Sequence, residues 1–193
     1  MAEAESVIPI RMSRPDLEGI GQYGAPAPFF LRWYEAGDEQ RWVRITSRAD
    51  IYNRIDESLF RREFGQDRAL LAQRQCYLCD AGGEAIGTAT AWFNDDYRGG
   101  SWGRVHWVDI VPEYQGRGLG RALVSAVCHR LRQLGHQRAY LTTESPRIPA
   151  IRLYLRFGFR PDVQNQSDAR VWREVARRLP DDLRHLVETE VRQ

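Results

Sequence analysis

The most restrictive feature of this sequence is a glycine-rich turn between an extended segment that ends at a proline and an amphipathic helix. The turn reads Gln-Gly-Arg-Gly-Leu-Gly over residues 115–120 and follows Pro112 closely. After it, apolar residues recur at spacings of three, four and seven up to Leu134, and Gly135 follows as a C-cap. The pattern predicts a strand, a sharp turn and a helix over 119–134.

A turn of this kind suits an anion. Its three glycines, Gly116, Gly118 and Gly120, allow positive φ angles and a close approach of the backbone. The first amides of the helix have no internal partner and lie at the positive end of the helix dipole, where phosphates bind. Arg117 and Arg121 add charge at the rim. A tight turn without a ligand is the alternative.

Two other phosphate-binding motifs do not fit the turn. A P-loop requires a lysine followed by serine or threonine, and neither is present. A dinucleotide fingerprint has the spacing G-x-G-x-x-G within a βαβ unit, whereas the strands predicted around this turn are antiparallel.

The rest of the chain is divided by periodicity and by turn residues. Strands are predicted over 29–34, 76–80, 85–93, 104–111, 138–143 and 159–160, and helices over 37–49, 56–64, 119–134, 150–157, 168–179 and 181–192. The stretch 94–103 is predicted as a polar loop, and residues 1–28 as a proline-rich arm of uncertain order. The order of elements indicates a mixed α/β fold around one sheet.

Composition narrows the class of protein. The 193 residues, 42% hydrophobic and 28% charged, suffice for one globular domain. A net charge of +2 argues against a dedicated nucleic-acid binder, and no apolar run is long enough to span a membrane. Residues 1–10 carry acidic and no basic side chains, so no secretory signal is expected and the location is predicted to be cytoplasmic. Cys76 and Cys79 form a lone C-x-x-C, and no metal site is expected.

Two motifs in order resemble the GNAT superfamily of N-acetyltransferases. Residues 115–120 match its R/Q-x-x-G-x-G/A motif, and the preceding Val-Asp-Ile-Val-Pro-Glu-Tyr is similar to its fourth strand. Residues 150–159 are similar to its A-I-x-L-Y-x-x-x-G-F segment. The resemblance covers about residues 85–160. It implies an α/β (α+β) GNAT-like single domain: a mixed, mostly antiparallel sheet of about six to seven strands flanked by helices, with splayed fourth and fifth strands.

The expected organisation is an N-terminal arm over 1–28, a GNAT-like domain over 29–165 and a C-terminal helical tail over 166–193. The tail departs from the family, which often has a seventh strand there. The resemblance implies an N-acetyltransferase that moves acetyl from acetyl-CoA to a primary amine of a small molecule or peptide by direct attack on the thioester. A non-catalytic acyl-CoA-binding or regulatory module is the alternative. Neither a nucleic acid nor a membrane is expected as partner, and a homodimer is left open.

The resemblance also implies a cofactor site. Backbone groups of Val108, Asp109 and Ile110 are expected to hold the pantetheine arm, and an amide near Ile110 to stabilise the oxyanion. The pyrophosphate is expected on the turn. Arg147 stands where the family commonly has asparagine, and is expected to contact a phosphate, an acidic substrate or only solvent. The remaining residues of this expected site are Gln115, Gly116, Arg117, Gly118, Leu119, Gly120, Arg121 and Tyr154.

The expected catalytic residues are Tyr154, His106 and Glu144. Tyr154 matches the family tyrosine that protonates the departing thiolate, with a core tyrosine as the alternative. His106 shares a face with Val108 and Ile110 if no bulge intervenes, and is one candidate base. Glu144, which follows the fifth strand, is the other. Asp109, on the opposite face, and a water relay without a single base remain open.

Overall fold

Seven strands form one open sheet in the order β2-β3-β4-β5-β6-β1-β7. Neighbouring strands are antiparallel except β5 and β6, which are parallel. The mixed, mostly antiparallel α/β sheet expected from the sequence is thus confirmed. The antiparallel arrangement predicted around the glycine turn is wrong, because the parallel strands β5 and β6 lie on either side of the turn and of the helix that follows it in the chain. The strands are β1 (Pro9–Arg14), β2 (Phe30–Trp33), β3 (Gln75–Cys79), β4 (Ala85–Tyr97), β5 (Gly100–Ile110), β6 (Ala139–Glu144) and β7 (Arg160–Pro161).

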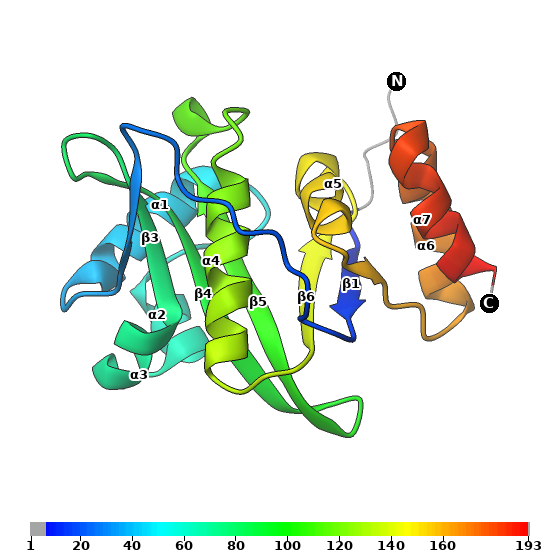
Figure 1. Ribbon diagram of the computed structural model, residues 1–193, viewed down its shortest axis with the longest axis horizontal. Helices are drawn as coiled ribbons and strands as arrows, with labels where there is room; N and C mark the ends of the chain where they lie inside the picture. The colour runs from blue at the N-terminus through cyan, green and yellow to red at the C-terminus, as the bar shows by residue number, and fades with distance from the viewer. Residues whose placement is uncertain (1–6, 193) are drawn as a thin grey trace.

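The computed structural model describes residues 7–192; residues 1–6 of the expected arm and Gln193 of the expected tail lie outside the described residues. The helices are α1 (Asp38–Ala49), α2 (Glu57–Phe64), α3 (Arg68–Arg74), α4 (Gly120–Gln133), α5 (Ile148–Arg156), α6 (Gln166–Arg177) and α7 (Asp181–Val191). Helix α4 crosses one face of the sheet, with α1 behind it on the other (Figure 1). Within residues 7–192, no helix is long and apolar enough to cross a membrane.

Strand β1 lies inside the stretch for which the sequence predicted only an arm. It pairs with β6 on one side and with β7 on the other. Its alternate residues Ile10 and Met12 are buried, as a half-buried strand requires. Pro9 begins the strand and Pro15 follows it, and the prolines and glycines of residues 1–28, without periodicity, led us to predict an arm or loop. The sheet therefore closes with a segment from the N-terminal part of the chain.

The predicted loop over 94–103 is also wrong, because β4 and β5 extend almost to the tip of a hairpin. Tyr97 pairs with Gly100, and the two turn residues between them, Arg98 and Gly99, have φ angles of 51° and 70°. Positive φ at both central positions is typical of a type I′ turn, which matches the twist of a hairpin. The sequence also missed α3. Strand β7 has only two residues, and the chain then continues into α6 and α7.

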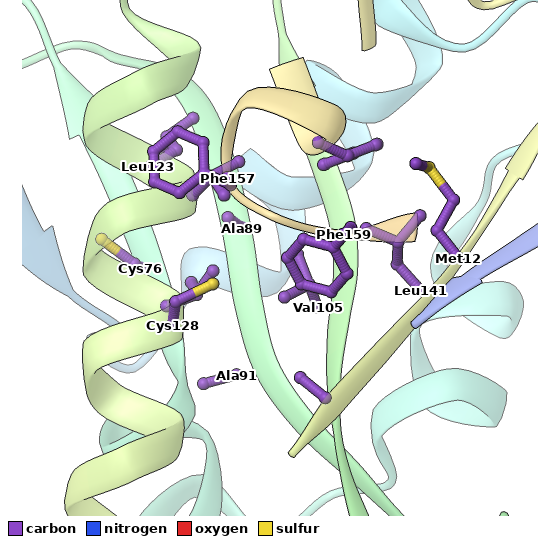
Figure 2. Close-up of a cluster of buried hydrophobic side chains, with 14 of the residues drawn as sticks. Met12, Cys76, Ala89, Ala91, Val105, Leu123, Cys128, Leu141, Phe157 and Phe159 are labelled. Carbon is purple, nitrogen blue, oxygen red and sulfur yellow. The ribbon is translucent and has the colours of Figure 1, made fainter. Parts of the chain in front are cut away.

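The hydrophobic core lies mainly between α4 and the sheet. Figure 2 shows Leu123 and Cys128 of α4 directed at Ala89 of β4 and Val105 of β5. The other face carries an aromatic cluster centred on Trp42 of α1, which is fully buried. These two layers cover both faces of β4 and β5, and the features of β5 described next lie between them.

Strands β5 and β6 separate along their length, as the sequence led us to expect. Their ladder consists of the pairs Gly103 with Ala139 and Arg104 with Tyr140. Beyond Arg104, no residue of β5 is paired with β6, although both strands continue toward their carboxyl ends. The two strands therefore leave a gap, which we call the β5–β6 gap, and helix α5 follows directly on the β6 side of it (Figure 1).

Candidate active site

A β-bulge interrupts β5 within the β5–β6 gap, beyond the last residue that pairs with β6. Thr88 pairs with Asp109 and Thr90 with His106, so β5 has one residue more than β4 between these pairs. Trp107, within the bulge, has a φ of 48°. An extra residue reverses which face of the sheet the earlier side chains occupy.

The bulge moves His106 to the face opposite Ile110. His106 Nε2 lies 2.7 Å from Glu63 Oε2 of α2, whereas Ile110 and Leu123 of α4 both approach Gly87. The expectation that His106 shares a face with Val108 and Ile110 is therefore wrong, because it required a strand without a bulge.

His106 is neutral near neutral pH. Burial lowers its pKa to about 4, although the hydrogen bond with Glu63 acts in the opposite direction. That hydrogen bond in turn lowers the pKa of Glu63 to about 2. Trp107 Nε1 donates to the same Glu63 oxygen at 3.2 Å. Because Glu63 remains ionised, it favours the His106 tautomer with a proton on Nε2.

The open end of the gap holds an arginine between two carboxylates. Arg147 Nη2 lies 2.7 Å from Asp50 Oδ2, and its Nε lies 2.5 Å from Glu144 Oε2. Its guanidinium also stacks over the ring of Tyr52 at 5.0 Å. Asp50 follows α1, Glu144 ends β6 and Arg147 precedes α5, so this group joins three elements.

Asp109 lies next to this group and is only 5% exposed. Burial raises its pKa to about 7; the charges of Asp50 and Glu144 add to this effect, while the charge of Arg147 and a hydrogen bond from the Thr46 hydroxyl oppose it. Within residues 7–192, its Oδ2 has no hydrogen-bond partner. Near neutral pH the carboxyl group therefore exists in both protonation states.

Tyr154 of α5 belongs to the same electrostatic environment. Burial raises the pKa of its hydroxyl, and the charges of Asp109 and Glu144 raise it further, while Arg147 lowers it. The hydroxyl is therefore protonated near neutral pH and can donate a proton or a hydrogen bond. The structure thus brings Tyr154, Glu144, Arg147 and Asp109 together, and directs His106 toward α2.

Among the described residues, the glycine turn has free space around two of its glycines and backbone amides without hydrogen-bond partners. Gly116 and Gly118 have φ angles of 74° and 77°, and a Cβ added at either would meet nothing within 4 Å. The amides of residues 116–120 have no acceptor within the described part of the chain. They are thus available to an anion, as the helix start predicts.

The turn contacts both β5 and α5. Gln115 Nε2 donates to the Ile110 carbonyl at 2.7 Å, which fixes the turn against the end of β5. A Cβ on Gly120 would lie 3.0 Å from Leu153, the residue before Tyr154. The start of α4 is therefore packed against the helix that carries Tyr154.

Arg117 does not face the free amides. Its Nη2 donates to the Glu113 carbonyl at 2.9 Å, and its guanidinium stacks over the Tyr114 ring at 4.9 Å.

Two residues that shape the site were missed in the sequence. Asp50 and Glu63 lie just after α1 and within α2, where no motif exists. One signal was present for Asp50: Arg147 stands at a position where the GNAT superfamily commonly has a neutral asparagine, and an arginine there that is partly buried favours a carboxylate partner. For Glu63 no signal was available, because the bulge that directs His106 toward it cannot be read from residue spacing.

A family model described as the acetyltransferase (GNAT) family matches residues 31–159. A mycothiol acetyltransferase from Pseudarthrobacter chlorophenolicus is 34% identical over 169 residues, which cover 78% of this chain and 48% of that protein. One from Clavibacter sepedonicus is 30% identical, covering 74% and 46%. The chain spans about half the length of these curated relatives.

A GCN5-related N-acetyltransferase structure from Sphaerobacter thermophilus is similar with a TM-score of 0.67 at 18% identity, covering 80% of this chain and 48% of that one. The ribosomal-protein-S18-alanine N-acetyltransferase from Escherichia coli has a TM-score of 0.55 at 22% identity, covering 67% and 76%. At these identities the similarity establishes the fold.

Proposed function

The chain belongs to the GNAT family of acetyltransferases, and from this premise we propose that it transfers an acetyl group from acetyl-CoA to a primary amine. The observation that carries the proposal is the β5–β6 gap. At its open end lie Tyr154 and three carboxylates, and the packing of Gly120 against Leu153 brings the open glycine turn next to them. Phosphate-binding amides and proton-transfer groups therefore share one end of the sheet.

The proposed cofactor site uses the backbone. The free amides of residues 116–120, together with Arg121, hold the pyrophosphate at the start of α4. Residues 108–110 of β5 have no paired strand on the side of β6 and hold the pantetheine arm. One of their groups, the Ile110 carbonyl, already accepts from Gln115, so the remaining ones are proposed to serve acetyl-CoA.

The proposed reaction requires an acid, a base and an oxyanion donor. Tyr154 is the proposed acid, because burial keeps its hydroxyl protonated. An amide near Ile110 is proposed to stabilise the oxyanion of the tetrahedral intermediate. Glu144 and His106 are proposed as candidate bases. Glu144 forms an ion pair with Arg147, and His106 is hydrogen-bonded to Glu63. Each would therefore have to accept a proton while it remains bound to a charged residue.

We expect the substitution Gly118→Val to weaken acetyl-CoA binding by about 5- to 30-fold. A valine at a φ of 77° is strained by about 1–2 kcal/mol, and its side chain projects beside the free amides. Calorimetric titration with acetyl-CoA measures the change. Gly83→Val is the matched control, because Gly83 has a φ of 83° and equally open surroundings but lies in the β3–β4 turn. Equal losses in both variants would contradict a binding role for the turn.

A thiol-release assay tests the proposed activity. Purified protein is incubated with acetyl-CoA and a panel of polyamines, aminoglycosides, amino acids and peptides with free N-termini. Since the curated relatives are named for mycothiol, mycothiol-related amines join the panel. Amine-dependent release of free thiol supports the proposal. Binding of acetyl-CoA without release for any amine would instead favour a non-catalytic acyl-CoA-binding module.

We further propose that the acetyltransferase unit consists of residues 29–165 together with β1, which the sheet includes. The helical tail over 166–193 packs on this unit through α6 and α7 within the described residues. A cytoplasmic location is proposed, with neither nucleic acid nor membrane as a partner; the net charge of +2 supports the absence of a nucleic-acid partner. Cell fractionation tests the location, and light scattering tests whether a homodimer forms.

A further inference from the structure

Carboxyl groups outnumber cationic groups at the open end of the β5–β6 gap. Asp50 and Glu144 both bind Arg147, and Asp109 lies within the electrostatic reach of all three. Three carboxyl groups therefore share one guanidinium. Asp50 and Glu144 occupy the two sides of this guanidinium, so Asp109 is the carboxyl group left without a cation of its own.

Of the three carboxyl groups, Asp109 is also the one whose hydrogen bonding is incomplete. It is 5% exposed, and within residues 7–192 its Oδ2 has no hydrogen-bond partner. The hydroxyl of Thr46 on α1, which is fully buried beside it, lowers the pKa of Asp109 as a hydrogen-bond donor, but this contact does not have normal hydrogen-bond geometry. Buried carboxylates are almost always hydrogen-bonded or paired with a cation, since desolvation without compensation is costly. An incoming ammonium group supplies both the donors and the charge that are missing.

We propose that Asp109 is the residue that receives the acceptor as an ammonium ion and removes its proton. This inference rests on the proposed acetyl transfer and adds to it a general base and the protonation state in which the primary amine arrives. The position is suitable because Asp109 lies in the part of β5 that is proposed to hold the pantetheine arm. The attacking nitrogen and the thioester would then meet beside this carboxylate.

The proton inventory balances without a further reactant. Asp109 takes one proton from the ammonium, and the nitrogen lone pair forms the C–N bond to the thioester carbonyl. The C–S bond breaks with its electron pair on sulfur, and the sulfur takes a proton from the Tyr154 hydroxyl. The nitrogen, cationic after the attack, gives a second proton back to the Tyr154 oxygen. The products are the amide, free CoA and one proton on Asp109 that passes to solvent.

The ionisation of Asp109 supports this role. Its pKa of about 7 places a useful fraction of carboxylate near neutral pH, which suits a general base. The charged and titratable groups that face it come from every neighbouring element: Asp50 after α1, Glu144 of β6, Arg147 before α5 and Tyr154 of α5. Asp50 and Glu144 raise its pKa, and Arg147 lowers it.

The experiment measures kcat/KM against pH for the wild type and for Asp109→Asn, with acetyl-CoA and with spermidine, glucosamine and alanine amide as acceptors. For the wild type we expect kcat/KM to fall below about pH 7, because protonated Asp109 accepts no proton. For Asp109→Asn we expect a loss of about 100-fold or more near neutral pH. Its remaining rate should rise through pH 7 toward the pKa of the free amine, since only the unprotonated amine then reacts.

Three further variants separate this role from a structural one. Asp50→Asn retains one acceptor oxygen but removes a negative charge beside Asp109, so the fall in kcat/KM should move to lower pH. Glu144→Gln and His106→Gln remove the other candidate bases, and both should keep the fall in kcat/KM that Asp109 causes. In His106→Gln the fall should stay at the same pH, whereas in Glu144→Gln it should move to lower pH, because this change also removes a negative charge near Asp109. Asp109→Glu keeps a carboxyl group at this position, so kcat/KM should still fall toward low pH. Should Asp109→Asn not fold, as judged by calorimetric acetyl-CoA binding, the displacement in Asp50→Asn is the decisive measurement.

The outcomes distinguish this inference from the proposed function. A wild type that releases no thiol with any of the amines overturns both. An active wild type together with an Asp109→Asn variant that keeps the rate and the same acid-side fall overturns the role of Asp109 alone. Loss of the fall in Glu144→Gln or His106→Gln, with no displacement in Asp50→Asn, would assign the base to that residue instead.

Discussion

Replacing Tyr154 by phenylalanine is expected to lower kcat about 100-fold or more, while the affinity for acetyl-CoA changes little. The side chain is 6% exposed, and burial together with the nearby carboxylates keeps its hydroxyl protonated. The hydroxyl is therefore suited to protonate the departing thiolate. Phenylalanine keeps the ring and its edge-to-face contact with Phe159, so only the proton donor is lost. Steady-state thiol release and calorimetric titration with acetyl-CoA measure the two quantities.

The control for Tyr154→Phe is the same change at another tyrosine. Tyr23 packs its ring against Phe157, just beyond α5, and is 47% exposed. Tyr23→Phe should leave kcat unchanged. A Tyr154→Phe variant whose kcat is intact would show that Tyr154 is only a core residue. A parallel loss of acetyl-CoA affinity would mean that the hydroxyl serves binding rather than proton transfer.

The predictable parts of the fold are those that local sequence specifies. The apolar spacing in α4 and the glycines around it predicted a helix over 119–134, close to the observed Gly120–Gln133. Strand β1 was not predictable in this way, since its six residues are stabilised by β6, about 130 residues away. The hairpin tip was missed for a related reason. Its polar residues indicated a loop, whereas Tyr97 is buried by stacking on Tyr140 of β6.

The candidate site divides in the same manner. Tyr154, the glycine turn and the end of β5 lie in motifs of the GNAT superfamily, so their proximity could be predicted from the sequence. Asp50 lies outside any motif, and its ion pair with Arg147 exists because α1 ends beside the β5–β6 gap. The face of the sheet on which His106 lies depends on one additional residue in β5. Side chains alternate between the two faces of a strand, and an extra residue reverses this alternation for the residues before it.

The substitution Asp109→Asn should stabilise the protein progressively as the pH rises. The pKa of Asp109 is about 7 in the folded state and close to 4 in an unfolded chain. Below about pH 4 both states are protonated, and ionisation has no effect. Between about pH 4 and pH 7 the unfolded state loses the proton first, so the wild type loses up to about 1.4 kcal/mol of unfolding free energy per pH unit from this group. Asparagine has no such loss.

Urea unfolding of both proteins near pH 5 and near pH 8 measures this effect. The advantage of Asp109→Asn over the wild type should grow between these two values by about 1–3 kcal/mol, whatever its sign at the lower pH. Asp38→Asn is the control: Asp38 is also buried, but hydrogen bonds from Arg32 and Arg41 hold its pKa below the ordinary value despite burial. The loss in unfolding free energy caused by Asp38→Asn should be the same at both pH values. An advantage for Asp109→Asn that does not grow with pH would mean that the Asp109 carboxylate already has a partner in the folded protein. Growth as expected would mean that the free enzyme carries an uncompensated charge in the β5–β6 gap, and binding a cationic amine there would recover the free energy that this charge costs.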